Sequence, residues 1–240
     1  MLLYIYSPYR FFYDPTYILV IIGVLLSMGA QYMINSRFKK YSKVRSMRSV
    51  TGSQAADAIL RTQGIFDVRI EHCSGHLSDH YDPKNKVLRL SDSTYNSTSV
   101  AAIGVAAHEC GHAIQHARGY VPVRLRSTFV PVANIGSYAS WILIIIGLLF
   151  SGSSSQLFLT AGIVCFAATV LFHIITLPVE FNASSRAIKV LEGNGILYGD
   201  EIKGARKVLG AAALTYVASA ATAILQLLRL IILYGGKRRD

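Results

Sequence analysis

Three long runs of apolar residues constrain this 240-residue chain more than any other feature. They cover about 17–34, 131–150 and 157–177, and none contains Asp, Glu, Lys or Arg. Each run is long enough to cross a bilayer whose hydrocarbon core is about 30 Å thick. Because 52% of all residues are hydrophobic, an ordinary soluble domain is excluded. The sequence therefore predicts a mainly α, membrane-embedded protein.

The basic residues predict how these runs are oriented. The net charge is +11, but nine of the 24 basic residues gather beside the membrane, and the remaining 15 nearly balance 13 acidic ones. This placement indicates a topology signal and a contact with anionic lipid, so we expect no nucleic acid partner. We therefore expect the chain to enter the cytosol after residue 34. The nine residues are Arg37, Lys39, Lys40, Lys43, Arg45, Arg48, Lys237, Arg238 and Arg239.

Two further segments complete the membrane part. The six residues 151–156 are too short for anything except a hairpin tip, so the chain after residue 177 returns to the cytosolic side. A last apolar stretch, 208–234, carries polar residues at helical spacing and is predicted as an amphipathic helix. We expect it to pack this polar stripe on the protein or to lie at the interface, because a fourth span would carry the C-terminal basic residues outside. The stripe consists of Thr215, Ser219, Thr222, Gln226 and Arg229.

Residues 49–130 form the longest polar stretch and predict a small α+β unit. A capping box at Thr51–Gln54 starts a short helix, and alternating patterns at 66–70 and 86–91 predict a short two-stranded sheet. Ser97 or Ser99 can cap the helix that follows, and Gly119 can end it. Residues 178–207 are expected to complete this unit.

The helix after Ser99 carries His108-Glu109-Cys110-Gly111-His112, an H-E-x-x-H motif. Residues four apart share one face of a helix, so His108 and His112 can bind one zinc ion, and Glu109 is placed to act as general base. Shuffling this composition gives the motif in only about 0.4% of chains, so two surface histidines by chance are the weaker interpretation. Cys110 points away from the histidine face and is interpreted as packing.

A catalytic zinc usually takes a third protein ligand. Glu180 is the favoured candidate because it follows the returning apolar run, although a helix N-terminal acid stabilised by the helix dipole is the alternative. His116 lies about 12 Å further along the helix than His108, too far for the same ion. The remaining candidates, in the loop-rich region, are His72, His76 and His80.

The order of these segments, ending in Glu180-Phe-Asn-Ala-Ser-Ser-Arg-Ala187, resembles the YugP-type neutral zinc metallopeptidases of bacterial membranes. More distantly it is similar to the HtpX-type membrane proteases. The resemblance implies that His108, His112 and Glu180 hold zinc and that Glu109 is the base. The chain has Ser184 where the HtpX-type pattern has Asp, which makes the support of a metal histidine a weaker hydrogen bond.

We therefore predict that residues 1–240 form one membrane metallopeptidase domain with a zincin-like catalytic unit. It would lie in the cell membrane as a multi-pass protein, with its active site facing the cytosol and a peptide or protein as substrate. A substrate strand would add to 86–91. The candidate oxyanion partners are His76, His80, Tyr81 and Arg186.

Three rival functions remain open. An intramembrane protease is disfavoured because only about eight apolar residues precede His108 and no acid interrupts 131–177. A catalytically silent, zinc-stabilised membrane scaffold has no need of Glu109, and a metal transporter is weaker because the runs lack acids. The sequence names no oligomeric state.

Overall fold

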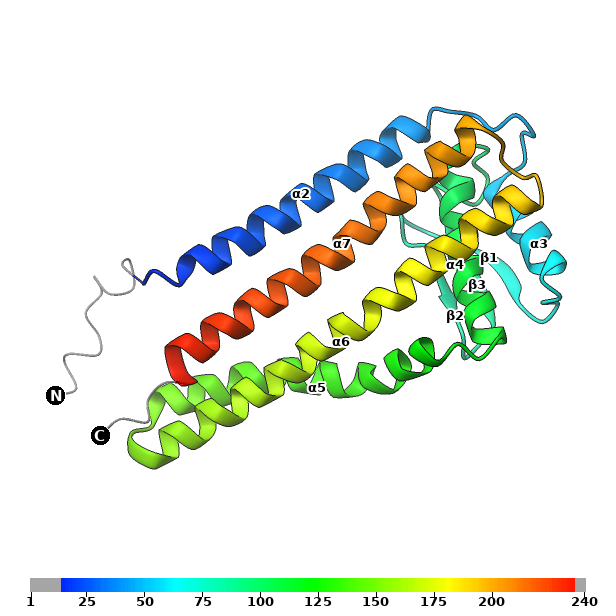
Figure 1. The fold of residues 1–240 in the computed structure, drawn as a ribbon. Helices are drawn as coiled ribbons and strands as arrows, with labels where there is room; N and C mark the ends of the chain where they lie inside the picture. The colour runs from blue at the N-terminus through cyan, green and yellow to red at the C-terminus, as the bar shows by residue number, and fades with distance from the viewer. Residues whose placement is uncertain (1–13, 236–240) are drawn as a thin grey trace. The chain divides into compact units, whose positions relative to one another are not determined.

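The computed structural model describes residues 14–235 and confirms a mainly α fold with a small sheet (Figure 1). Four helices, α2, α5, α6 and α7, are long and apolar enough to cross a membrane. The elements in chain order are α2 (Tyr17–Tyr41), α3 (Gly52–Thr62), β1 (Arg69–Cys73), β2 (His80–Asp82), β3 (Val87–Ser91), α4 (Val100–Ala117), α5 (Val121–Leu149), α6 (Gly152–Gly193), α7 (Asp200–Leu230) and a π-helical turn at Ile231–Gly235.

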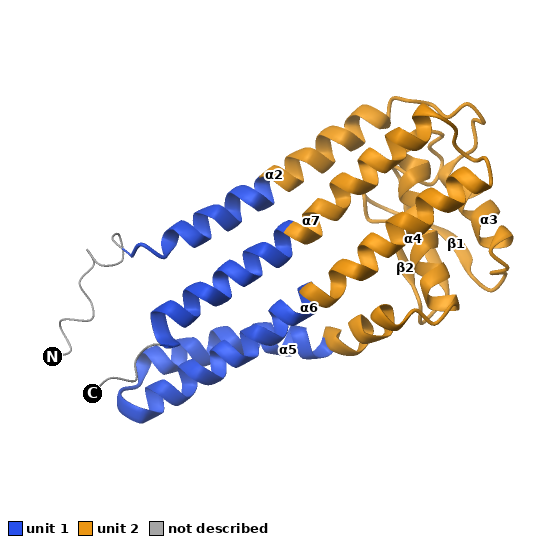
Figure 2. Cartoon of the chain, in the orientation of Figure 1, with its two compact units in different colours: residues 1–28, 131–173, 218–240 blue, residues 29–130, 174–217 orange. Residues whose placement is uncertain are grey.

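The chain divides into two compact units (Figure 2). Within the described residues, the first unit contains 14–28, 131–173 and 218–235, and the second contains 29–130 and 174–217. Each long helix therefore has one part in each unit. The predicted apolar runs 131–150 and 157–177 lie mainly in the first unit, and the H-E-x-x-H helix lies in the second.

In the first unit, α5 and α6 form the predicted hairpin, but its tip is shorter than expected. Only Phe150 and Ser151 separate the two helices, because residues 152–156 already belong to α6. Small residues let the helices approach closely: a Cβ on Gly136 would lie 2.8 Å from the carbonyl oxygen of Cys165. Close approach through small residues is how membrane helices associate without a hydrophobic driving force between them.

The polar stripe of α7 packs on the protein in the first unit. The Thr222 hydroxyl donates to the carbonyl oxygen of Gly23 at 3.1 Å and lies 3.2 Å from Ser27 Oγ. Arg229 pairs with Asp14 at 3.2 Å. The helix is longer than the predicted 208–234 because it begins at Asp200, and its length and composition make it a fourth candidate span where the sequence analysis favoured three.

The sheet of the second unit has three strands, so the prediction of two strands is wrong. Its order is β1-β3-β2, with β3 parallel to β1 and antiparallel to β2. β1 begins three residues later than the predicted 66–70. β2 was missed because a three-residue strand is too short to show an alternating pattern.

Apolar faces of α3, α4 and β3 form the core of the second unit. Leu88 and Leu90 of β3 are fully buried, and they belong to one cluster with Ile103 and Ile114 of α4. The capping box of Thr51 with Gln54 is present as predicted. Ser99 caps α4 by accepting a hydrogen bond from the backbone N–H of Ala102 at 3.2 Å. These caps fix where the motif helix begins.

The motif helix α4 lies against α6 at a point where only glycine fits. A Cβ on Gly111 would lie 2.5 Å from the carbonyl oxygen of Ala183, and Ala183 is itself fully buried. Neither backbone can move away without opening the core. Gly111 therefore sets the distance between the motif helix and the helix that carries Glu180.

We predict that Gly111→Ala lowers stability by about 1–3 kcal/mol, because an added methyl group overpacks this contact. The midpoint of thermal unfolding of the purified full-length protein measures the effect. Gly210→Ala is the matched control: it lies inside α7 with no atom within 4 Å of the added Cβ, so its midpoint should stay equal or rise. Equal midpoints for both variants would contradict the close approach.

Candidate metal centre

His108, His112 and Glu180 lie together in the second unit. His108 Nε2 is 3.3 Å from Glu180 Oε2, and His112 Nε2 is 3.6 Å from the same oxygen. The donor atoms of the three residues all lie within 4.8 Å of one another. The structure thus brings together the two motif histidines and the carboxylate that the sequence analysis favoured.

Glu180 reaches this position from the interior of a long helix. It follows the N-terminus of α6 by 28 residues and is 1% exposed. The alternative of a helix N-terminal acid stabilised by the helix dipole is therefore wrong. A carboxylate buried this deeply needs positively charged or hydrogen-bonding partners, because moving its negative charge out of water costs several kcal/mol.

Both motif histidines are held at their second ring nitrogen. Ser184, one turn after Glu180, places its hydroxyl 3.1 Å from His108 Nδ1. Gln115 Oε1 lies 3.1 Å from His112 Nδ1. Gln115 is itself fixed, because its amide nitrogen donates to the carbonyl oxygen of Val179 at 2.8 Å. Contacts at Nδ1 leave each Nε2 directed at the shared position, which is how metal-binding histidines are usually oriented.

Arg126 holds the other oxygen of the buried carboxylate. Its Nη1 donates to Glu180 Oε1 at 2.9 Å, so Oε2 alone faces the imidazoles. Sequence reasoning missed Arg126 because it lies on α5, 54 residues before Glu180. The only feature of the sequence that pointed to Arg126 was its charge, five residues before the apolar run 131–150. This ion pair stabilises Glu180 as a carboxylate with a single oxygen available for a metal.

Glu109 lies beside the three donors. It is 9% exposed, and burial raises the pKa of its carboxyl group. Together with His112 and Glu180 it lines a cleft of about 310 Å³. A raised pKa makes this carboxylate a stronger proton acceptor than an exposed glutamate, which is the property a general base needs. The cleft is also lined by His80, Tyr81, His116, Arg126 and Tyr216.

The other histidines that the sequence analysis considered do not join the group. His72 bonds Asp92 at 2.6 Å, and the ring of His76 packs against Phe38. His80 Nδ1 lies 2.9 Å from the carbonyl oxygen of Ser78. His116 lines the cleft, where its Nδ1 is 3.3 Å from the Tyr81 hydroxyl, but it is not among the three donors.

The proposed oxyanion partners separate into two pairs. His80 and Tyr81 line the cleft, whereas His76 and Arg186 do not. Arg186 instead donates to Asn182 Oδ1 at 2.7 Å. Tyr216 lines the cleft and was missed, because an uncharged tyrosine in an apolar stretch resembles a packing residue.

Cys110 is a packing residue, as the sequence analysis expected. It is fully buried, its thiol lies 3.7 Å from the carbonyl oxygen of Ala56, and burial raises its pKa. All three cysteines are free. None of them belongs to the metal-binding group found in the described residues.

Two imidazole nitrogens and one carboxylate oxygen are the donors of a common class of catalytic zinc site, which leaves a fourth position for water. Glu180 is buried, the two histidines are largely shielded from solvent, and all three are oriented by hydrogen bonds with Ser184, Gln115 and Arg126. The arrangement fits a zinc ion and gives each ligand the support that its orientation requires.

Comparison with known proteins places this geometry in context. Residues 16–235 match a family model described as "Putative neutral zinc metallopeptidase". A protein of Bacillus subtilis (strain 168) called "Putative membrane protease YugP" is 44% identical over 216 residues, which cover 90% of this chain and 95% of the relative. No solved structure matches. All three donor residues lie inside the matched range.

We predict that the purified wild-type protein contains stoichiometric zinc and that His112→Ala and Glu180→Gln lose it, because two remaining ligands hold zinc weakly. His116→Ala is the matched control, since it removes a histidine that lines the same cleft without belonging to the donor group. Metal analysis by inductively coupled plasma mass spectrometry measures the difference. Full zinc content in Glu180→Gln would remove this residue from the ligand set.

Proposed function

The chain belongs to the family described as "Putative neutral zinc metallopeptidase", and we propose that it is a membrane-bound zinc metallopeptidase that hydrolyses a peptide or protein. Membership confirms the resemblance found in the sequence. The observation that carries the proposal is the convergence of His108, His112 and Glu180 on one position beside Glu109. His112, Glu180 and Glu109 also line one cleft. The proposal takes the whole chain as one functional domain.

The chain's own residues perform the proton transfers. His108, His112 and Glu180 would hold zinc, which when bound acidifies a water molecule and polarises the scissile carbonyl. Glu109 takes the proton of the attacking water and passes it to the leaving amine. Its position next to His108 and its raised pKa support this role, because the same carboxyl group must both accept and return a proton.

Other groups that line the cleft can stabilise negative charge on the substrate oxygen. The cleft offers the phenol groups of Tyr81 and Tyr216 as hydrogen-bond donors, whereas the Nδ1 of His80 already donates to the carbonyl oxygen of Ser78. Arg126 contributes positive charge from its place beside Glu180. A developing oxyanion is stabilised most by donors that are already oriented before reaction. We propose these residues in place of His76 and Arg186.

The substrate strand is proposed to add to β2. Addition to 86–91, the position expected from the sequence, is wrong because β3 already pairs with β1 on one side and β2 on the other. β2 is an edge strand, and its residues His80 and Tyr81 line the cleft. A peptide that extends the sheet at β2 would therefore run beside Glu109.

The position of the motif helix argues against the intramembrane rival. α4 is not one of the four candidate spans, and its apolar residues pack into the core of the second unit. A silent scaffold would need the three donors but no buried carboxyl group beside them. The raised pKa and burial of Glu109 favour the enzyme, because burying an unused acid is costly.

We further propose a multi-pass orientation with the cleft on the cytosolic side. Lys39 and Lys40 occupy the last turn of α2, followed by further basic residues up to Arg48. Basic residues next to a span stay in the cytosol. The chain returns to the same side after the α5–α6 hairpin, which carries Glu180 into the compartment of His108.

We predict that Glu109→Gln retains zinc but lowers the rate of peptide cleavage by about 10²–10⁴-fold, because the amide cannot accept the proton. The measurement compares zinc content and cleavage of casein by the purified full-length protein. Glu192→Gln is the matched control, since Glu192 is exposed and does not line the cleft. Zinc retention with unchanged cleavage would exclude Glu109 as the base, and no cleavage by the wild type would favour the scaffold.

Orientation is tested by thiol labelling in a chain whose native cysteines are replaced by serine. Lys84→Cys lies next to β2, Ser153→Cys lies in the first turn of α6 beside the hairpin tip, and both positions are exposed. We predict that a membrane-impermeant maleimide labels position 153 in intact cells and position 84 only after permeabilisation. The reverse pattern would place the cleft outside.

A further inference from the structure

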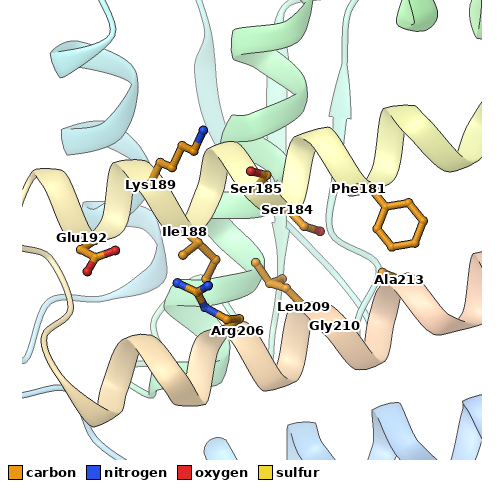
Figure 3. Close-up of a pocket in the computed structure, with 10 residues that line it drawn as sticks. All are labelled: Phe181, Ser184, Ser185, Ile188, Lys189, Glu192, Arg206, Leu209, Gly210 and Ala213. Atoms are coloured by element: carbon orange, nitrogen blue, oxygen red, sulfur yellow. The ribbon is translucent and has the colours of Figure 1, made fainter.

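A groove of about 470 Å³ runs between α6 and α7 in the second unit (Figure 3). α6 lines it with residues three or four apart from Phe181 to Glu192, and α7 lines it from Arg206 to Ala213. The groove shares no lining residue with the metal cleft. Its volume lies in the range of small-molecule sites, about 300–1,000 Å³.

The groove changes from apolar to charged along its length. Phe181 and Ala213 lie together at one end, and Glu192 and Arg206 lie towards the other (Figure 3). The apolar end is where both helices continue into their apolar stretches, 157–177 on α6 and 208–234 on α7. An occupant therefore meets apolar side chains on the side of the bilayer and charges further from it.

The charged end is positive. Arg206 extends from α7 towards Ile188 on α6 (Figure 3), and among the described residues it forms no ion pair. Lys189, which also lines the groove, is exposed and forms no ion pair within 14–235. Glu192 is the only carboxylate of the lining. An anion beside Arg206 would thus meet a local excess of positive charge.

We propose that this groove binds one anionic phospholipid of the surrounding bilayer, with its phosphate at Arg206 and an acyl chain along Phe181, Leu209 and Ala213. From Phe181 to Lys189 the helix rises about 12 Å. This rise along α6 matches the thickness of a lipid headgroup layer, roughly 5–7 Å, plus the first carbons of an acyl chain. An acidic peptide would match the charge but leave the apolar end uncovered. The proposal does not depend on peptidase activity.

The test uses tryptophan fluorescence, because the chain has a single tryptophan, Trp141, on α5 in the first unit. Phe181 is 50% exposed, so Phe181→Trp in a Trp141→Phe background places a reporter at the apolar end of the groove. The full-length protein is reconstituted into vesicles of phosphatidylcholine with either brominated phosphatidylglycerol or brominated phosphatidylcholine at equal fraction. Bromine quenches the tryptophan that its acyl chain contacts.

We expect brominated phosphatidylglycerol to quench the reporter more strongly than brominated phosphatidylcholine. The wild-type chain, which reports from Trp141, should show no such preference. Arg206→Gln should lower the preference at the reporter about fivefold, the effect of ~1 kcal/mol for one cation near an anionic lipid. Lys207→Gln is the matched control, since it removes an equal, neighbouring charge that does not line the groove and should leave the preference unchanged.

Equal quenching of the reporter by the two lipids would overturn the proposal. So would equal losses in Arg206→Gln and Lys207→Gln, because that result means attraction to the general surface charge. If Arg206→Gln fails to fold, Glu192→Gln decides the question: removing the only carboxylate of the lining should raise the preference for phosphatidylglycerol, and an unchanged preference would exclude the groove.

Discussion

The arrangement of the candidate metal centre depends on one buried carboxylate, Glu180, and on the charged and polar groups around it. Glu180 is 1% exposed, so its charge must be balanced inside the protein. Arg126 from α5 satisfies one oxygen, and the motif histidines of α4 surround the other. Three consecutive helices, α4, α5 and α6, are therefore held to one another by a carboxylate that would be costly to bury alone. A zinc ion at the shared position would complete this balance.

Packing makes the ionic arrangement precise. Gly111 lets α4 approach the backbone of α6 at Ala183, one residue before Ser184, whose hydroxyl contacts His108. Gln115 connects the ring of His112 to the backbone of α6 in the same way. The Ser184 hydroxyl contacts His108 at a place where a carboxylate would be the stronger hydrogen-bond partner. Arg126 places its positive charge against Glu180 from a different helix, α5.

α6 serves two surfaces at once. One face presents Glu180 to the motif helix, and an adjacent face lines the groove against α7. Because α6 continues without interruption from an apolar run to the metal centre, a lipid in the groove would lie on the helix that carries a metal ligand. The proposed lipid site and the proposed metal ligand would then lie on the same helix, as expected of a protease that acts beside a bilayer.

The sequence by itself predicted the three apolar runs, the capping box, a serine cap at residue 97 or 99 and the H-E-x-x-H motif, because periodicity, capping and motif spacing are local properties of the chain. It also favoured Glu180 as a third ligand, through its place after the returning apolar run. It did not give the third strand, the edge position of β2, or the roles of Arg126, Gln115 and Tyr216. Those depend on contacts between residues far apart in the chain, such as the 54 positions between Arg126 and Glu180. Only the tertiary structure decides them, since a side chain's partner is set by where helices pack and not by its neighbours in sequence.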